Sequence, residues 1–413
     1  MTATLAGSTA ILKRKYPKGA IPQETYSSFQ NMAMMKKSTD FVGEDEAVVL
    51  QTENPQGIGA SIADAQASME QGSYKRFLLT RVELFGVARI KGQAHKAAVE
   101  RNDGSLVDLW NNETRGIETS LMKDHEIYSF GNGSGVRGQL NAGVVSGTTV
   151  TLLTPEDAVN FDLNMWVQAV SDSTLSPTTR SGKTKITGID RKLGVLTTSA
   201  NWNAQIPAIG VSDYLVRAST GASGGTAVVP NGYQSWIVGG ATPGTFLGLD
   251  RNTDPVRLSG QTTAYAAGTP IEEALVDADS QIGLQWMSGE KRVVVMNNRD
   301  VANLKKQLGT KVQYDRVKSN VAGISFKTIE VEGETGPIAI LANPFCPRRK
   351  AFMLTQSSWE IRGLGPVPQL QDFDKNDFLR VATDDAVEAR FCSYSNTKCT
   401  LPVAQFLMTN VGA

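Results

Sequence analysis

The sequence is poor in the residue types that most often build catalytic and metal sites. Its 413 residues include only 3 cysteines and 2 histidines. Cys346, Cys392 and Cys399 are odd in number and scattered, so they predict buried, reduced thiols rather than a disulfide framework. Cys392 and Cys399 also lack the second pair of ligands that a structural zinc site needs. We therefore expect no metal site and no cofactor.

The sequence also lacks long apolar runs and an excess of charge of either sign. No segment has the roughly 18 consecutive apolar residues of a membrane-spanning helix, so we expect no membrane partner. At the N-terminus the basic cluster follows the apolar patch, which is the wrong order for a secretory signal. Lys plus Arg and Asp plus Glu number 41 each, so the formal net charge is zero. Because proteins that grip nucleic acid usually carry a basic excess, this balance argues against a dedicated DNA-binding protein.

Two glycine motifs lack the context that their chemistry requires. Residues 133–138 match G-x-G-x-x-G, but a predicted helix precedes them and a predicted strand follows, which inverts the dinucleotide-binding order. We expect a hinge there. Residues 221–225 match G-x-S-x-G around Ser223, yet His95 and His125 both precede this serine, whereas the matching hydrolase fold needs a later histidine. A flexible loop is the simpler interpretation, and a serine hydrolase remains an alternative.

One acidic segment resembles the start of a calcium-binding loop. Asp372, Asp374 and Asn376 have the spacing of the first ligands of an EF-hand. The position that should be Gly is Asp377, and the position that should be Glu is Thr383. These departures indicate a solvated acidic loop. We therefore predict a protein that is not an enzyme, with no catalytic, cofactor-binding or metal-binding residues.

What the sequence does contain is glycine and short strand-like runs. Its 39 glycines and 7% aromatic content indicate many turns, and 413 residues suffice for two or three domains. An approximate apolar stripe over 103–130, with Asp103 or Ser105 as the cap, predicts one long helix. Strand-like runs lie at 47–52, 77–90, throughout 132–226, at 323–341, 351–361, 386–394 and 403–409.

The best-marked stretch of the chain is 246–309. Its glycines and a proline predict an ordered loop over 249–260, rather than a helix or strand. Thr269 is the candidate N-cap of the next helix, with Pro270 at the first helical position, a glutamate completing a capping box, and Gly289 as the stop.

The same stretch continues with a second unit of structure. Residues 293–296 form a short apolar run that predicts a buried strand. Asn298 is the candidate cap of a second helix, which Gly309 ends. The segment 249–255 (LDRNTDP), together with the capped helix after it, resembles the middle of tailed-bacteriophage major capsid proteins, which share the HK-ninety-seven-type fold.

This resemblance implies an α+β phage major-capsid fold with a particular order of domains. It combines an N-terminal arm, an extended β-hairpin loop, a peripheral domain with a long spine helix, a central axial α/β domain and an inserted β-rich domain. The implied boundaries are 1–47 for the arm, 48–95 for the extended hairpin loop, 96–131 for the spine helix, 132–226 for the insertion, 227–345 for the axial domain, and 346–413 for the rest of the peripheral domain and the closing strands.

The resemblance also implies a structural function. The expected protein assembles with itself as hexamers and pentamers into an icosahedral shell around double-stranded DNA, which it contacts weakly and without sequence preference. Scaffolding, portal and decoration proteins are further expected partners. The expected location is the virion capsid, assembled in the bacterial host cytoplasm. An encapsulin-like nanocompartment shell is the main alternative function.

Overall fold

The computed structural model describes residues 29–91, 109–143, 145–286, 290–308, 318–321, 324–327, 329–334, 336–372, 379–381 and 383–412. The chain forms two compact units. Leu84–Lys123 and Val367–Ser393 make up most of unit 1, and unit 2 comprises Gln30–Glu83, Asp124–Pro366 and Tyr394–Ala413. Within the described residues, no helix is long and apolar enough to cross a membrane. The two units are described separately below.

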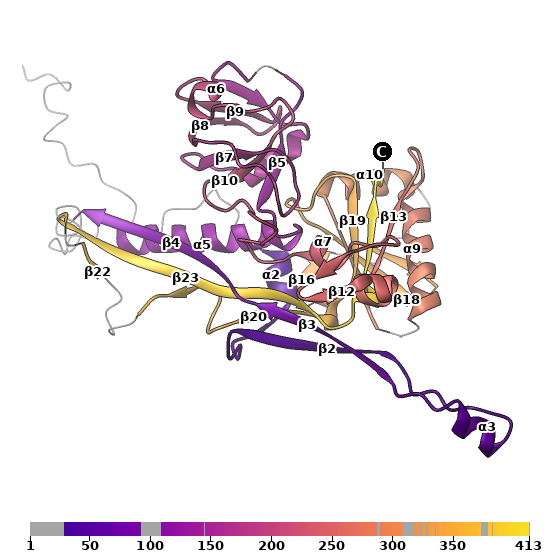
Figure 1. Ribbon diagram of the computed structural model, residues 1–413. Helices are drawn as coiled ribbons and strands as arrows, with labels where there is room; N and C mark the ends of the chain where they lie inside the picture. Colours follow the sequence, from indigo (N-terminus) through magenta and orange to yellow (C-terminus); the bar gives the residue numbers. More distant parts are fainter. Residues whose placement is uncertain are drawn as a thin grey trace, which may run out of the picture. The chain divides into compact units, whose positions relative to one another are not determined.

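Unit 2 contains a mixed six-stranded sheet, here called the central sheet, in the order β13-β24-β19-β14-β18-β17 (Figure 1). Its strands are β13 Gln261–Ala264, β14 Arg292–Met296, β17 Ile329–Gly333, β18 Gly336–Ala342, β19 Lys350–Thr355 and β24 Phe406–Thr409. The middle strand β14 pairs parallel with β18 and antiparallel with β19, and all 5 of its residues are buried. The predicted buried strand at 293–296 is confirmed.

Two helices, α9 Ile271–Gln285 and α10 Asn298–Leu308, cover one face of the central sheet. Their apolar sides share a core with Val294 and Met296, which alternate along β14 and so point to the same face. The helices also contact each other. This arrangement explains why the sequence carries two helical apolar stripes on either side of a short apolar strand.

The starts of these helices differ by one residue from the predictions. α9 begins at Ile271 with Pro270 as its N-cap, so the predicted Thr269 cap is wrong. The Ile271 N–H donates instead to Gln307 Oε1 on α10, at 2.9 Å. The N-terminus of α10 is capped by Asn297, whose Oδ1 accepts from the Arg299 N–H at 3.0 Å, and not by Asn298. The predicted stops at positions 289 and 309 lie outside the described residues.

Aromatic side chains pack on the other face of the central sheet. Phe352 of β19 lies 5.5 Å from Phe130 and 5.6 Å from Tyr233, measured between ring centroids. Tyr233 belongs to the short helix α7 Tyr233–Trp236, and its ring also meets Trp359 at 4.7 Å in an edge-on contact. These rings join the central sheet to the end of the long helix and to β20 Trp359–Gly363.

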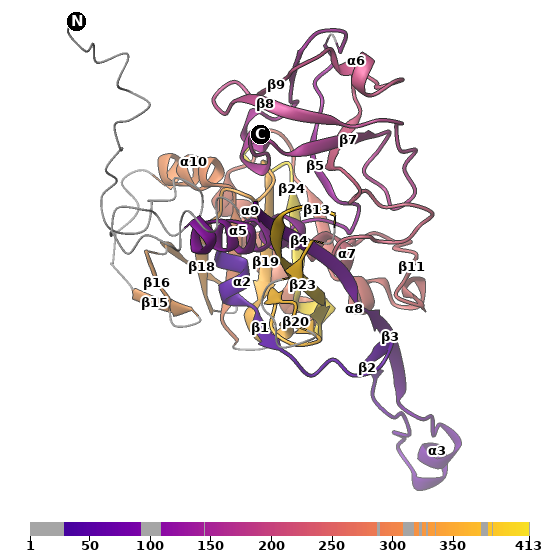
Figure 2. The same ribbon diagram turned by 90° about the vertical axis from the view of Figure 1, so that its left-hand side faces the viewer.

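Six strands between Val136 and Arg217 form one curled sheet, and this part of the chain is here called the barrel domain (Figure 2). Its strands are β5 Val136–Gln139, β6 Thr149–Thr151, β7 Trp166–Val170, β8 Thr184–Asp190, β9 Val195–Thr198 and β10 Tyr214–Arg217. They pair in the order β5-β10-β7-β8-β9-β6, and an antiparallel bridge between Leu140 and Leu152 returns from the end of β6 to the end of β5. The short helix α6 Trp202–Gln205 and the 3-10 helix η1 Pro155–Asn160 add Trp202 and Ala158 to the core. The strands predicted in this region are confirmed.

The chain enters and leaves the barrel domain at one crossing. Gly133 has a φ of +85°, and a Cβ on it would come within 2.8 Å of Asn231 Oδ1 and 2.9 Å of Ala227 Cβ. At Gly135, with a φ of +78°, a Cβ would come within 2.1 Å of the Thr220 carbonyl oxygen. Only glycine fits both the conformation and the space. The G-x-G-x-x-G segment is therefore a close-packed crossing between a helix and a strand, in the inverted order that was predicted.

Unit 1 is built around a strand and a helix that lie against each other. β4 Val82–Lys91 pairs with β23 Ala386–Cys399, which also pairs with β21 Gln369–Leu370 and β22 Leu379–Arg380. A Cβ on Gly86 of β4 would come within 2.6 Å of Ile117 Cγ2 on the long helix α5 Leu109–Ser129. The long predicted helix is confirmed over its described part, while its predicted caps lie outside the described residues.

The remaining elements of unit 2 are short. Residues 395–399 of β23 pair with β20, and β20 pairs in parallel with β1 Lys36–Ser38. The other elements are α2 Gln30–Met34, β11 Thr245–Phe246, β12 Leu249–Asp250, η2 Arg251–Thr253, α8 Pro255–Ser259, β15 Lys318–Val321, β16 Ile324–Lys327, η4 Gln356–Ser358 and η5 Pro402–Ala404. The last predicted strand begins at Phe406 instead of 403, because the proline at 402 opens a 3-10 turn.

Candidate functional site: an anchored hairpin

A long antiparallel hairpin joins β2 Asp45–Glu53 to β3 Ser73–Thr80 (Figure 1). Its root is buried on one side, where Val48 pairs in register with Phe77 and both side chains are shielded from solvent. Farther out, Val49 and Tyr74 are exposed. The two predicted strands and the hairpin that joins them are confirmed, although the run predicted over 77–90 is divided between β3 and β4.

The tip of the hairpin, residues 54–72, exposes large apolar side chains. Ile58, Ile62 and Met69 are 89%, 80% and 67% exposed. The tip contains the short helix α3 Ile62–Ala67, which buries none of its residues and is capped by Ser61 Oγ accepting from the Asp64 N–H at 3.2 Å. Local hydrogen bonds thus order a segment that has no core of its own. Exposed apolar groups on an ordered projection are typical of a protein–protein contact surface.

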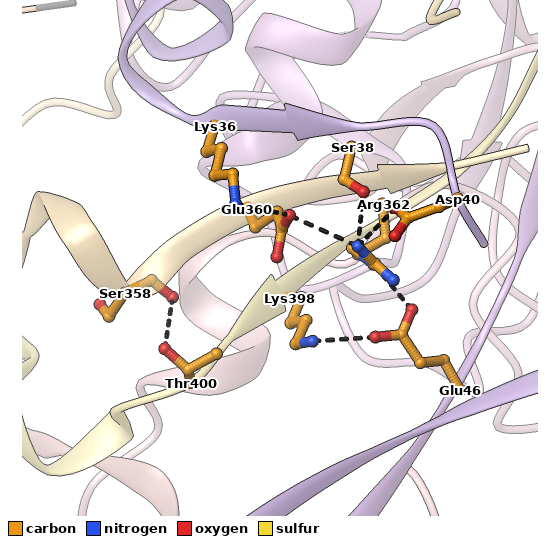
Figure 3. Close-up of polar contacts among 9 residues, drawn as sticks. All are labelled: Lys36, Ser38, Asp40, Glu46, Ser358, Glu360, Arg362, Lys398 and Thr400. Carbon is orange, nitrogen blue, oxygen red and sulfur yellow. Dashed lines mark hydrogen bonds and ion pairs between the residues drawn. The ribbon is translucent and has the colours of Figure 1, made fainter. Parts of the chain in front are cut away.

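A cluster of charged groups, here called the root clasp, holds the start of the hairpin (Figure 3). Glu46 of β2 accepts from Arg362 Nε of β20 at 2.7 Å and from Lys398 Nζ of β23 at 2.8 Å. Arg362 Nη1 also donates to Asp40 Oδ1, at 2.8 Å, and to the Ser38 hydroxyl. Burial alone would raise the pKa of Glu46, but the hydrogen bonds from Lys398 and Arg362 outweigh burial and lower that pKa. The guanidinium group of Arg362 therefore joins β20 to β1 and to the hairpin, and Lys398 joins β23 to the hairpin through Glu46.

A second anchor comes from the LDRNTDP segment. Asp250 Oδ1 accepts from the Asn252 N–H and caps η2, and Asp254 Oδ1 accepts from the Arg257 N–H and caps α8. The loop predicted over 249–260 is therefore wrong: Asp254 and the proline after it start a short helix, as these residues do at N-cap and first helical positions. This helix directs Arg257 to the hairpin.

Arg257 binds the hairpin where its body ends. Its Nη1 donates to the Thr52 carbonyl oxygen and to Glu53 Oε1, the latter at 2.6 Å. The β2–β3 register shifts between Gln51 and Glu53, so the contact lies at a β-bulge. Beyond this bulge the tip begins. Arg257 thus holds the hairpin at the point where the tip begins.

Arg251, also in the LDRNTDP segment, supports the root of the hairpin through the residues packed against it. Its guanidinium is buried, donates to the Ser235 and Pro243 carbonyl oxygens at 2.9 and 3.1 Å, and lies 4.7 Å from the Phe246 ring centre. Burial lowers its pKa to about 10. This value is still well above 7, so the guanidinium group is charged at neutral pH. Phe246 in turn packs edge-on against Phe77 of β3, at 6.1 Å between centroids. Through Arg251 and the Phe246 ring, the LDRNTDP segment therefore supports the root of the hairpin.

The first described residues of the chain are anchored in a different way. The Asn31 and Met32 N–H groups donate to the two carboxylate oxygens of Glu126 on α5, at 3.0 and 3.1 Å, and Asn343 Nδ2 donates to Glu126 Oε1 at 2.6 Å. Glu126 is fully buried, and this burial raises its pKa despite the hydrogen bonds that its carboxylate accepts. One carboxyl group thus fixes residues 31 and 32, which lie within the predicted arm, to the long helix.

The sequence candidates for chemistry do not form a reaction centre in the described chain. Ser223 lies in a tight turn, where its N–H and carbonyl bond to Thr226. His125 is buried in α5, and desolvation lowers its pKa to about 4, whereas His95 lies outside the described residues. Cys346, Cys392 and Cys399 are buried free thiols, as predicted.

Metal ligands are likewise dispersed. Over the described ranges, no group of three or more His, Cys, Asp or Glu side chains could hold a metal ion. Asp374, Asn376 and Asp377 of the EF-hand-like segment lie outside these ranges. The arrangement of the described residues thus supports a contact surface, with the hairpin as its most exposed part.

Comparisons with known proteins give a consistent result. Residues 214–382 match the family model described as SU10 major capsid protein. No curated protein sequence matches the chain. The structure resembles the capsid asymmetric unit of cyanophage A-1(L) with a TM-score of 0.56 and 10% identity, over 100% of both chains. It resembles the capsid of an empty GTA particle with a TM-score of 0.54 and 10% identity, over 98% of this chain and 97% of that one.

A third similar structure forms a shell of another kind. The holo-SrpI encapsulin complex from Synechococcus elongatus PCC 7942 matches with a TM-score of 0.50 and 8% identity, over 100% of this chain and 96% of that one. At such identities the structures establish the fold. The predicted α+β, HK-ninety-seven-type capsid fold is therefore confirmed over the length of the chain.

Proposed function

We infer that this chain is the major capsid protein of a tailed double-stranded DNA bacteriophage, which assembles with copies of itself into the icosahedral shell of the head. The family-model match over 214–382 and the shared fold support this function. The observation that carries the mechanism is the anchored hairpin, because it presents apolar side chains that its own subunit does not cover.

The geometry suggests how one subunit binds the next. The root clasp and Arg257 hold the body of the hairpin to its own subunit, whereas the tip with Ile58 and Ile62 is free to bury its apolar groups on a neighbour. Each such contact is small, but repetition around hexamers and pentamers makes the closed shell stable. In this proposal 48–95 is the extended loop, 96–131 the spine, and 227–345 the domain nearest the capsomer axis.

Further partners belong to the same proposal. Scaffolding, portal and decoration proteins would bind the assembled shell, and packaged DNA would make weak contacts with its inner wall, since the chain has no net charge. Assembly would take place in the host cytoplasm, and the chain would have no catalytic activity. In the same proposal, residues 1–47 form the N-terminal arm, 132–226 the inserted domain, and 346–413 the closing part of the peripheral domain.

The test is deletion of residues 57–72. We expect the shortened chain to remain folded, because α3 buries none of its residues and the two anchors lie outside the deletion. We also expect it to fail to form closed shells. Light scattering and negative-stain images of the same fractions would measure both, with full-length protein as the control. Normal shells from the shortened chain would show that the hairpin does not drive assembly.

An encapsulin-like shell is a second candidate, favoured by the match to the SrpI complex. Both functions predict self-assembly, so shell formation does not separate them. The content of particles purified from the native source does: double-stranded DNA supports the phage head, and an enclosed cargo enzyme supports the compartment. A neighbouring portal or terminase gene would favour the head as well.

A further inference from the structure

The tip of the hairpin combines apolar side chains with negative charge. Residues 54–72 contain two acids, Asp64 and Glu70, and neither lysine nor arginine. Both acids are exposed, as are Ile58, Ile62 and Met69. A surface that binds this segment should therefore offer an apolar hollow with basic groups at its edge.

The body of the hairpin keeps the tip away from its root. The 9 residues of β2 span roughly 30 Å at about 3.3 Å per residue. Glu46 near one end binds Arg362, and Thr52 near the other end binds Arg257, so the strand is held along its length. Figures 1 and 2 both show α3 far from α2. A surface beside α2 is thus within reach of the tip of another copy and not of its own tip.

Two hollows in unit 2 already use their basic groups internally. The first has a volume of about 350 Å³ and the second of about 510 Å³. In the first, Arg137 binds Asp124, Arg348 binds Asp300 and Lys350 donates to Gln234, and in the second Arg257 binds Glu53. These basic groups are therefore already engaged within the subunit.

A third hollow, here called the methionine groove, lies beside α2 and has a volume of about 490 Å³. Its lining includes Ala33, Met34 and Met35 at the end of α2, and Gln356 and Ser357 of η4. Gln356 Nε2 donates to the Met34 carbonyl oxygen at 3.2 Å, which ties the two segments together. Because methionine side chains adapt to the shape of what they contact, this groove suits an irregular apolar partner.

Two lysines belong to the same lining. Lys291 is exposed, and within the described ranges no hydrogen bond or ion pair engages it. Lys36 has a side chain that is 80% exposed and lies 3.8 Å from Glu360, an ion pair of little strength. Glu290, the acid of the lining, accepts a hydrogen bond from the Ser357 hydroxyl. The groove therefore offers positive charge beside an apolar surface.

We propose that the methionine groove binds the hairpin tip of a second copy of this chain. The apolar side chains of the tip would lie against the methionines, and its two acids beside Lys36 and Lys291. The inference rests on the proposed shell-forming function and names the surface that the tip binds.

The geometry of such a contact determines how it repeats. The tip and the groove are different surfaces of one chain, so the contact is heterologous and leaves one tip and one groove unused in every pair. Contacts of this kind continue from copy to copy and close into a ring when the rotation allows it. The methionine groove thus gives a physical reason for ring-shaped capsomers.

The first test traps the contact in assembled particles. Ala63→Cys combined with Ser357→Cys places one thiol in the tip and one in the groove, and leaves the apolar side chains and both lysines unchanged. Mild oxidation should link subunits into a ladder that reaches pentamers or hexamers on a denaturing gel. The native cysteines are buried and do not interfere. Ala63→Cys with Gln285→Cys, in the 510 Å³ hollow, is the matched control and should give no ladder.

The second test exchanges the charges. Asp64→Lys with Glu70→Lys, or Lys36→Glu with Lys291→Glu, turns attraction into repulsion. We expect each pair of changes to lower the yield of sedimentable particles about tenfold. The chain that carries all four changes should return to within about twofold of the wild type, because the contacts are restored with exchanged signs.

Net charge needs its own control, because the fourfold variant also restores the balance of charges. The tip-reversed chain with Lys192→Glu and Lys305→Glu has the same net charge, but its new acids lie on β8–β9 and α10, outside the groove. We expect no recovery of particles from it.

The outcomes separate this inference from the function on which it rests. A wild-type chain that forms no shells contradicts the proposed function. Normal shells that give no ladder with Ser357→Cys, a ladder with Gln285→Cys, or equal recovery in the net-charge control would overturn the methionine groove as the binding surface and leave the shell-forming function in place.

Discussion

All 5 residues of β14 in the central sheet are buried, whereas Ile58, Ile62 and Met69 at the hairpin tip face solvent. The two regions carry similar apolar side chains. In the central sheet these side chains pack against α9 and α10 of the same chain, which makes that region self-sufficient. In the tip they find no cover within the subunit. The comparison shows that apolar side chains stabilise the subunit in one region, whereas in the other they remain available for a partner, as the proposed function requires.

The largest effect on subunit stability should come from the central sheet. Phe406→Ala removes a fully buried ring from its core. We expect the free energy of unfolding to fall by about 3–5 kcal/mol, the usual cost of such a cavity. Denaturant unfolding of the unassembled subunit would measure it. A loss below about 1 kcal/mol would mean that this sheet is not the main store of stability.

The root clasp should have an intermediate effect. Arg362→Met removes the donor that joins Glu46, Asp40 and Ser38. We expect a loss of about 2 kcal/mol, because several charge-assisted hydrogen bonds depend on one group. Hydrogen exchange of β2, together with denaturant unfolding, would show whether the loss is concentrated at the hairpin.

The control for the clasp is Lys36→Met. Lys36 is largely exposed and lies 3.8 Å from Glu360, so its ion pair should contribute less than about 0.5 kcal/mol. If both variants lost the same stability, the clasp would be no more than a surface ion pair.

Acid should weaken the clasp further. The folded-state pKa of Glu46 lies below its ordinary value of 4.5, so its contribution is present above that value and is lost as pH falls through the folded pKa. We expect the protection of β2 against hydrogen exchange to drop below about pH 4.5 in the wild type. Glu46→Gln should lack this acid-dependent step, and an identical drop in that variant would assign it to another group.

The smallest effect on stability should come from the tip. The double change Ile58→Ser and Ile62→Ser alters side chains that touch little of their own subunit, so unfolding should change by less than about 0.5 kcal/mol. Shell formation, followed by light scattering, should nevertheless fall sharply. Gln66→Ala, at an exposed position of the same segment, serves as a control that leaves the apolar side chains intact. If the double variant assembled at the wild-type level, the apolar side chains of the tip would have no role in assembly.

Local patterns made much of the fold predictable. The strand at 293–296, the hairpin strands and the long helix follow from apolar spacing, which acts over a few residues. Errors occurred where a distant group replaced a local one: Gln307 of α10 supplies the acceptor at the start of α9 that Thr269 was predicted to supply. At 249–260 the signal was present, since Asp254 before a proline is a helix start, but it was read as a loop.

The contacts that anchor the hairpin could not be predicted from the sequence. Glu46 and Arg362 are 316 positions apart, and Thr52 and Arg257 are 205 apart, so neither pair leaves a local pattern. The barrel closure depends in the same way on one bridge between Leu140 and Leu152.

The crossing at Gly133 and Gly135 has a consequence for how such shells diversify. Since the chain enters and leaves the barrel domain at adjacent points, the barrel is a cassette grafted onto one position of its host. Its six strands pair only with one another, and the bridge between Leu140 and Leu152 brings the two ends of the sheet together, so the described sheet takes no partner strand from the rest of the chain. Exchange of the whole cassette, with both glycines retained, would leave the core of the central sheet unchanged.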